Sequence, residues 1–304
     1  MIDPNSLSLV ELWSHLSSDG LARRLLELAR DEDLGNAGDV TASAMGESNE
    51  RVEAAVRARS AGVVAGAACL PMLVDVFDGA VEISEQRKDG ESVDAGDTVA
   101  LLTGRLADIV TIERTLLNLL GRMCGVATLT RRYVDAVEGT RARILDTRKT
   151  TPGLRAFEKY AVRCGGGANH RLGLYDAMLV KDNHLASIPL ERLTVEIATA
   201  SRRARERHDL AFVEVEVDSI PQFERLLDVP AGLVDIVLLD NMDPETLRAA
   251  VGMRDAAGSS LLLEASGGVR LESVRAIAET GVDRISVGAL THSAVSLDLG
   301  LDID

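Results

Sequence analysis

The second half of the chain alternates short apolar runs rich in β-branched residues with longer segments in which apolar residues recur at helical spacing. Such alternation predicts a parallel sheet whose strands are joined by right-handed helical crossovers. The repeated short strands favour closure into a barrel over an open sheet, so we expect an incomplete (β/α) barrel. The expected strands are Ala142–Asp146, Ala177–Lys181, Phe212–Val217, Ile236–Asp240, Leu261–Ala265 and Arg284–Val287, and the expected helices are Leu190–Arg207, Ile220–Leu227, Pro244–Ala256 and Leu271–Thr280.

The first half of the chain opens with helical patterns. Apolar residues recur at helical spacing over residues 7–30 and are interrupted at 17–20, which predicts two short helices. Residues 31–45 are rich in the turn formers glycine, asparagine and aspartate, so we expect a loop there. Asp39 and Thr41 are expected to cap a segment or to contact the neighbouring domain, and a structural role is favoured for them.

Alternating residues then predict a small sheet domain. Residues 52–66 have the pattern of a strand or hairpin, a helix is expected around residues 70–77, and short apolar runs cut by turns fill residues 81–104. A long helical pattern over residues 107–137, with an expected break near Gly125, connects the small sheet to the barrel.

The composition is that of an ordinary globular protein with an aliphatic core, because 46% of the residues are hydrophobic and only 3% are aromatic. A net charge of −15 argues against binding to nucleic acid or to an anionic membrane, since this field repels phosphates. No export signal and no long apolar stretch is visible, so we expect a cytoplasmic protein without a membrane span. Cys69, Cys124 and Cys164 are spaced too widely for a zinc knuckle or a redox pair.

One window inverts the sign of the charge. Residues 146–184 contain seven lysines and arginines against four acidic residues. Three of the four lysines of the chain and two of its five histidines lie there: Lys149, Lys159, Lys181, His170 and His184. The planar guanidinium groups of Arg148 and Arg171 suit carboxylates, while the ammonium groups of lysines suit phosphates. We therefore expect this window to hold several anionic groups, with His170 serving the site because its neighbours are too polar for packing alone.

Polar residues also follow the expected strands at their carboxyl ends, the face that carries the active site in barrels of this kind. They are Asp146, Thr147, Arg148, Lys149, Lys181, Asp182, Asn183, His184, Glu214, Glu216, Asp240, Asn241, Glu264, Ser266, Gly267, Gly268, Gly288, Thr291 and His292. Neither a Walker sequence nor a dinucleotide fingerprint is present, which disfavours ATP and NAD as ligands. Residues 266–268 and 287–289 are candidates for binding phosphate on backbone N–H groups, and simple turns are the alternative.

Two carboxylates are candidates for a metal site. Glu216 and Asp240 are expected at the ends of adjacent strands, where their oxygens suit Mg²⁺ bound to a substrate phosphate. Salt bridges to the basic window are the alternative. The residues alone thus predict a barrel enzyme that acts with Mg²⁺ on a phosphorylated, multiply anionic substrate.

The stretch DTRKTTPGLRAFEKYAVRCGGGANHRLGLYDAMLVKDNH, residues 146–184, strongly resembles the quinolinate phosphoribosyltransferase family of NAD biosynthesis. Further motifs follow in the family's order at Glu32–Thr41, Glu113–Thr128, Val213–Ser219, Leu238–Met242, Leu263–Val269 and Ile285–Ser293. The resemblance implies an N-terminal α/β-sandwich domain over residues 1–125, on which a C-terminal tail at 291–304 packs, and an incomplete (β/α) barrel over residues 126–290.

The resemblance also implies an activity: a pentosyltransferase joins the ring nitrogen of quinolinate to C1 of phosphoribosyl pyrophosphate, releasing pyrophosphate and CO₂ and giving nicotinate mononucleotide. Arg148, Lys149, His170 and Arg171 then face the pyridine dicarboxylate, and Lys181 is shared between the two substrates. Glu216 and Asp240 match residues that meet the ribose hydroxyls and the Mg²⁺–pyrophosphate. The implied phosphate site is made of Ser266, Gly267, Gly268, Gly288 and His292, and the implied substrate-binding set also includes Thr147 and Ala289. Arg114 matches an arginine contributed by the neighbouring subunit, which implies a homodimer and permits a trimer of dimers.

Two rivals follow from the same residues. A relative that acts on nicotinate or another pyridine-like acceptor, including homologues encoded beside molybdate transport genes, needs fewer anion-binding groups than are present here. A catalytically silent barrel that binds a phosphorylated metabolite is disfavoured by the intact pair Glu216 and Asp240.

Overall fold

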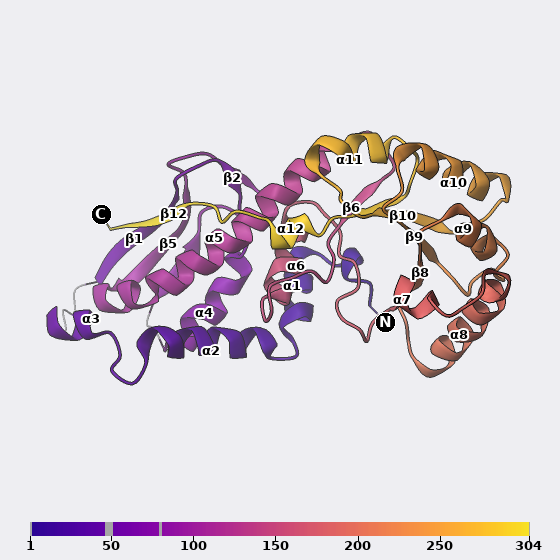
Figure 1. Ribbon diagram of the computed structural model, residues 1–304. Helices are drawn as coiled ribbons and strands as arrows, with labels where there is room; N and C mark the ends of the chain where they lie inside the picture. The colour runs from indigo at the N-terminus through magenta and orange to yellow at the C-terminus, as the bar shows by residue number, and fades with distance from the viewer. Residues whose placement is uncertain (1, 46–50, 79–80, 304) are drawn as a thin grey trace. The chain divides into compact units, whose positions relative to one another are not determined.

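The computed structural model describes residues 2–45, 51–78 and 81–303, which belong to two compact units (Figure 1). The parallel-sheet unit consists of Met1–Ser6, Arg132–Arg148 and Ala168–Ala289, and the antiparallel-sheet unit of Leu7–Arg131, Lys149–Gly167 and Leu290–Asp304. The division between Arg131 and Arg132 lies inside the long helix α5 (Leu106–Ala136). No helix in the described part of the chain is both long and apolar enough to cross a membrane.

The parallel-sheet unit confirms the expected alternation of strands and helices. Its sheet has the order β6-β11-β10-β9-β8-β7 and every pairing in it is parallel. The strands are β6 (Arg143–Leu145), β7 (Met178–Val180), β8 (Val213–Val217), β9 (Ile236–Asp240), β10 (Leu262–Ser266) and β11 (Arg284–Ser286). Among the described residues, no pairing joins the outer strands β6 and β7 to each other.

Helices lie along the outside of this sheet (Figure 1). They are α8 (Leu193–Arg207), α9 (Ile220–Leu227), α10 (Pro244–Ala256) and α11 (Leu271–Ala278), with the short α7 (Asp182–Leu185) after β7 and the 3-10 turns Pro4–Ser6 and Leu190–Arg192. Local signals begin α10: Asp243 caps it by accepting the N–H of Thr246 at 2.8 Å, and Pro244 occupies the first turn. Residues 236–239 of β9 are all buried, because a parallel sheet is covered on both faces.

The strand register gathers acidic side chains on one face of the sheet. Glu214 and Glu216 on β8 pair with Ile236 and Leu238 of β9, and Asp240 points to the same side as Leu238 because side chains alternate along a strand. Glu264 of β10 also pairs with Leu238. Glu214 is the second residue of its strand and Glu264 the third of its strand, so the expectation that both lie at carboxyl ends is wrong. Their depth in the sheet leaves both fully buried.

The antiparallel-sheet unit has a four-stranded sheet with the order β12-β1-β5-β3 and a separate pair of short strands. The strands are β1 (Arg51–Ala58), β2 (Gly62–Val63), β3 (Glu82–Glu85), β4 (Ser92–Val93), β5 (Thr98–Arg105) and β12 (Leu299–Ile303). The C-terminal strand β12 pairs with β1 in antiparallel register. The helices are α1 (Leu9–Ser17), α2 (Leu21–Leu34), α3 (Val40–Met45), α4 (Leu70–Val76), most of α5 and α6 (Arg155–Cys164), with a 3-10 turn at Ala67–Cys69 and α12 (Ala289–His292) beginning at the unit's border.

Two expectations for this part of the chain are wrong. Residues 31–45 were expected to form a loop, but α2 continues to Leu34 and α3 begins at Val40. The expected capping role of Asp39 is confirmed, since its carboxylate accepts the N–H groups of Thr41 and Ala42 at 3.0 and 2.9 Å. Turn-forming residues therefore cap a short helix here.

The expected break near Gly125 does not occur, because α5 runs unbroken from Leu106 to Ala136. A side chain at Gly125 would collide with the backbone carbonyl of Val295 in the C-terminal segment. The glycine therefore permits a close approach of two backbones and does not end the helix.

Candidate active site

The segment 168–171 is anchored beside β6 in the parallel-sheet unit. Ala168 bridges Leu145 in parallel fashion. The buried carboxylate of Asp146 accepts the backbone N–H of His170 and the side-chain amide of Asn169, both at 2.8 Å. These bonds fix the backbone from which the side chains of residues 170 and 171 project.

Two arginines with incomplete partners lie in the same unit. The Nε of Arg148 is buried and has no hydrogen-bond partner among the described residues. Arg171 is 7% exposed, and its guanidinium donates to the carbonyl of Ala177 at 3.4 Å. Burial lowers the pKa of Arg171, and the charge of Arg148 lowers it further. An unmatched buried donor beside a second cation indicates a site for an anion.

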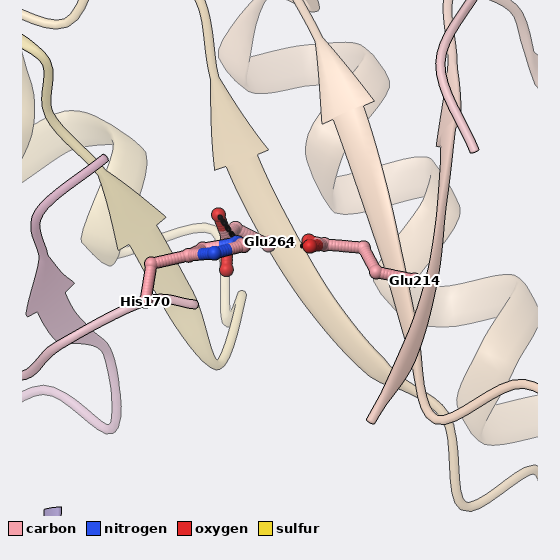
Figure 2. A group of neighbouring side chains, drawn as sticks. All are labelled: His170, Glu214 and Glu264. Atoms are coloured by element: carbon pink, nitrogen blue, oxygen red, sulfur yellow. Dashed lines mark ion pairs between the residues drawn. The ribbon is translucent and has the colours of Figure 1, made fainter. Parts of the chain in front are cut away.

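The Nε2 tip of the His170 ring points towards two buried carboxylates, those of Glu264 and Glu214 (Figure 2). Its Nε2 is 2.8 Å from Glu214 and 3.4 Å from Glu264, and its ring meets the edge of Phe212 with centroids 5.3 Å apart. Arg284 at the start of β11 completes the cluster, because its Nε donates to the second oxygen of Glu264 at 2.6 Å. These side chains come from four separate stretches of sequence.

The protonation state of His170 depends on the balance between burial and the two neighbouring carboxylates. Burial alone lowers the pKa of His170, but Glu264 and Glu214 outweigh it and raise the pKa to about 10. Nδ1 of the ring accepts the backbone N–H of Arg171 at 2.7 Å, and because Nδ1 can accept only while it carries no proton, this hydrogen bond favours the neutral ring. Such a hydrogen bond contributes about 1 kcal/mol, whereas a buried carboxylate without its cation costs about 3–5 kcal/mol. The protonated ring is therefore favoured.

His170, Glu214 and Glu264 also form a group whose ligand atoms all lie within 4.8 Å of one another, as a metal site requires. Glu264 already forms an ion pair with Arg284 at 2.6 Å. With the ring protonated, His170 and Arg284 face Glu214 and Glu264, so the charges of the cluster balance without a metal ion. Burial and the charge of Glu264 raise the pKa of Glu214, which makes this carboxyl easier to protonate. We interpret it as an ion-pair cluster.

The carboxylates Glu216 and Asp240 lie on the same face of neighbouring strands. Glu216 forms an ion pair with Lys181 at 3.4 Å, which is the alternative to metal binding considered for this residue. Asp240 accepts the side-chain amide of Asn241 at 2.6 Å. Both groups offer hard oxygen ligands, so the residues fit Mg²⁺ held together with a substrate phosphate.

The turn after β10 has a backbone shape that requires glycine. Gly267 and Gly268 have φ values of +93° and +58°. A side chain at Gly267 would collide with the side chain of Asn241 and lie 2.8 Å from its backbone N. The turn therefore presents bare backbone between Ser266 and α11.

The remaining site residues divide between the two units. Thr147, Gly288 and Ala289 belong to the parallel-sheet unit, whereas Arg114, Lys149 and His292 belong to the antiparallel-sheet unit. A hydrogen bond joins the backbone of Lys149 to the residue before His292, because the hydroxyl of Thr291 donates to the carbonyl of Lys149 at 2.7 Å. Arg114 is exposed on α5.

Sequence reasoning missed Arg284 as a member of the ion-pair cluster and Arg122 and Glu158 as members of a second network. Arg284 had one usable signal, a charged residue at the start of a short strand pattern. Glu158 is fully buried although it sits in a charged segment, and nothing local in the sequence distinguishes it.

The chain is similar to known proteins over most of its length. Family models match over residues 39–124, for the quinolinate phosphoribosyl transferase N-terminal domain, and over residues 126–302, for its C-terminal domain. The nicotinate-nucleotide pyrophosphorylase (carboxylating) of Mycobacterium leprae (strain TN) is 42% identical over 285 residues, which cover 93% of this chain and 97% of the relative. The probable enzyme of that name from Bacillus subtilis (strain 168) is 41% identical over 274 residues, 90% of each chain.

A solved structure also matches the fold of the whole chain. The structure of the nicotinate-nucleotide pyrophosphorylase from Francisella tularensis matches with a TM-score of 0.83 and 34% identity, covering 100% of both chains. Both family models and these relatives span most of the chain. The chain therefore belongs to the quinolinate phosphoribosyl transferase family.

Proposed function

We propose that this protein transfers the phosphoribosyl group of phosphoribosyl pyrophosphate to the ring nitrogen of quinolinate, with decarboxylation, and so makes nicotinate mononucleotide for NAD biosynthesis. Family membership and the relatives' names support this reaction. The observation that carries it is the pair Arg148 and Arg171. The buried Nε of Arg148 has no hydrogen-bond partner among the described residues, and burial, together with the charge of Arg148, lowers the pKa of Arg171. A dicarboxylate supplies the missing acceptors.

The transfer breaks the bond between C1 and the pyrophosphate oxygen and forms a bond from C1 to the ring nitrogen. Positive charge develops on the ribose carbon, and the leaving oxygens gain negative charge that lysines stabilise. Lys149 and Lys181 are the proposed donors, and the bare backbone at residues 266–268 and 288–289, with His292, is proposed to bind phosphate.

Decarboxylation follows at the carbon next to the alkylated nitrogen. The bond to CO₂ breaks, its electron pair stays on the ring carbon as an ylide stabilised by the cationic nitrogen, and a proton then replaces the lost carboxylate. This requires oriented carboxylates and a site shielded from water. Arg148 and Arg171 are the proposed orienting groups, and no nucleophile or covalent intermediate on the protein is needed.

Mg²⁺ is the proposed cofactor. Glu216 and Asp240 would hold it, largely through the substrate pyrophosphate, and when bound it neutralises the leaving group. Lys181, which pairs with Glu216 at 3.4 Å, would then be available to the substrates.

We further propose a homodimer in which Arg114 completes the neighbouring subunit's site. Its exposure on α5 makes it accessible to another chain. Co-expression of Arg114→Ala chains with Lys149→Ala chains is expected to restore part of the turnover that each variant lacks alone, because one site of each mixed dimer is then intact. Mixed dimers without activity would contradict a role for Arg114 across subunits.

The first assay follows nucleotide formation and CO₂ release from quinolinate and phosphoribosyl pyrophosphate, with nicotinate as the parallel acceptor. We expect turnover with quinolinate, loss of turnover when EDTA removes Mg²⁺, and recovery when Mg²⁺ is added back. Turnover with nicotinate alone would favour the rival acceptor, and turnover with neither would favour the silent metabolite-binding barrel.

A further inference from the structure

A network of charged groups inside the antiparallel-sheet unit connects the backbone of Lys149 to the turn that carries His292. We propose that Arg122 and Glu158 are positioning residues that hold Lys149 and His292 in the arrangement that binds substrate. The inference rests on the proposed function, because it requires these two side chains to act on substrate.

The first half of the network is the carboxylate of Glu158 on α6, which is fully buried. One oxygen accepts the hydroxyl of Thr151 at 2.8 Å, and the other accepts its backbone N–H at 2.9 Å. Thr151 lies two residues after Lys149. The loop that carries Lys149 is therefore tied by two bonds to a rigid helix.

The second half is the guanidinium of Arg122 on α5. Its Nε and one terminal nitrogen donate to Glu158 at 3.1 and 2.6 Å. Its other terminal nitrogen donates to the carbonyl of Ala294 at 2.7 Å. The terminal nitrogen that donates to Glu158 also donates to the carbonyl of Thr291. These two carbonyls flank His292 in the chain.

A last bond closes the circle. The hydroxyl of Thr291 donates to the carbonyl of Lys149 at 2.7 Å. The path from Lys149 through Thr291, Arg122, Glu158 and Thr151 thus returns to the loop that carries Lys149. Two segments far apart in sequence are fixed to the same ion pair.

The energetics favour a positioning role over a purely stabilising one. A buried ion pair offsets much of its attraction by desolvation, and well-packed apolar residues often stabilise a fold as well or better. What apolar residues cannot do is bind the N–H, hydroxyl and carbonyl groups of two loops with fixed geometry. A displacement of about 1 Å in such a site costs about 100-fold in rate.

The test compares three variants of the full-length protein. Glu158→Gln keeps the shape of the side chain, but its amide NH₂ cannot accept the bonds that both carboxylate oxygens accept. Arg122→Ala removes the guanidinium from the wall of a pocket of about 420 Å³, through which added guanidinium ion can reach the vacated position. Arg131→Ala is the matched control, because Arg131 also lies on α5 and its guanidinium donates to the carbonyls of Gly165 and Gly90, outside the network of Arg122 and Glu158.

We expect kcat/KM with quinolinate to fall about 10- to 100-fold in Glu158→Gln and Arg122→Ala. Hydrogen exchange at residues 149–152 should accelerate in both, and guanidinium ion should restore part of the activity of Arg122→Ala. Arg131→Ala should retain kcat/KM and show no response to guanidinium ion.

Normal kcat/KM in both variants, or an equal loss in Arg131→Ala that follows thermal unfolding and ignores guanidinium ion, would overturn the inference. If Arg122→Ala does not fold, Arg122→Lys replaces it, and an unchanged kcat/KM there together with an unchanged Glu158→Gln has the same meaning. Absence of turnover in the unaltered protein would contradict the proposed function and this inference with it, whereas the outcomes above contradict the inference alone.

Discussion

Replacing Arg171 or Lys149 by alanine is expected to reduce quinolinate turnover by about 100-fold or more while the fold remains intact. Arg171 is a buried cation beside Arg148. Its removal takes away a planar guanidinium that matches a carboxylate, and water does not easily replace it at a buried position. Lys149 is exposed and its backbone is fixed by Thr291, so truncating its side chain removes charge without opening the core. Steady-state kinetics with quinolinate and phosphoribosyl pyrophosphate measure the loss.

The matched control is Arg203→Ala, which removes an exposed arginine from α8. It should retain full turnover. Circular dichroism and thermal unfolding of all three variants separate lost chemistry from lost structure. Wild-type activity in purified Arg171→Ala or Lys149→Ala would overturn the assignment of that residue to the substrate site.

Replacing His170 by leucine is expected to lower the free energy of unfolding by about 3–5 kcal/mol at pH 6. The substitution leaves Glu214 and Glu264 buried with Arg284 as the cation of the cluster, so one buried carboxylate loses its counter-charge. Urea unfolding of the two proteins at matched pH gives the difference. His208→Leu, which changes an exposed histidine at the end of α8, should change stability little.

The same variant has a predictable pH dependence. The pKa of His170 is raised from 6.5 to about 10 in the folded protein. A raised pKa contributes stability that is complete below the unfolded value of 6.5 and is lost as pH rises through the folded value. The stability difference between the unaltered protein and His170→Leu should therefore be largest below pH 6.5 and should shrink towards pH 10. A difference that stays constant over this range would show that the ring is not protonated.

At acidic pH, the dependence of stability on pH is governed by Glu264. Burial by itself raises the pKa of this carboxyl, but His170 and Arg284 outweigh burial and lower it to about 2. A lowered pKa contributes stability that is complete above the unfolded value of 4.5 and is lost as pH falls towards 2. The contributions of His170 and Glu264 together are thus expected to stabilise the fold most between about pH 4.5 and 6.5.

Much of the parallel-sheet unit was predictable because its signals are local. Strands β8 and β9 and helices α9 and α10 lie where apolar runs and helical spacing predicted them, since each pattern is contained within a few consecutive residues. The arginines proposed to bind anions were also predictable, because Arg148 and Arg171 lie in a window whose charge is opposite to that of the chain.

Two expectations failed for different reasons. At Gly125, a contact between the backbones of distant segments overrules a local signal. Gly125 has the composition of a helix break, yet the approach of Val295 makes it a contact point within an unbroken helix. In residues 31–45, turn formers do not make a continuous loop, because Asp39 caps α3 by accepting the N–H groups of Thr41 and Ala42.

The sequence by itself determined the order of strands and helices, the family and the types of residue in the candidate site, because these depend on short motifs and on periodicity. Tertiary structure alone decided that His170 is buried against Glu214 and Glu264, and that Arg122 and Glu158 tie the loop of Lys149 to the turn of His292. Such pairings depend on strand register and on the path of the chain between distant segments. A buried charge is tolerated only where the fold places a partner of opposite charge beside it, and a local sequence pattern does not contain that information.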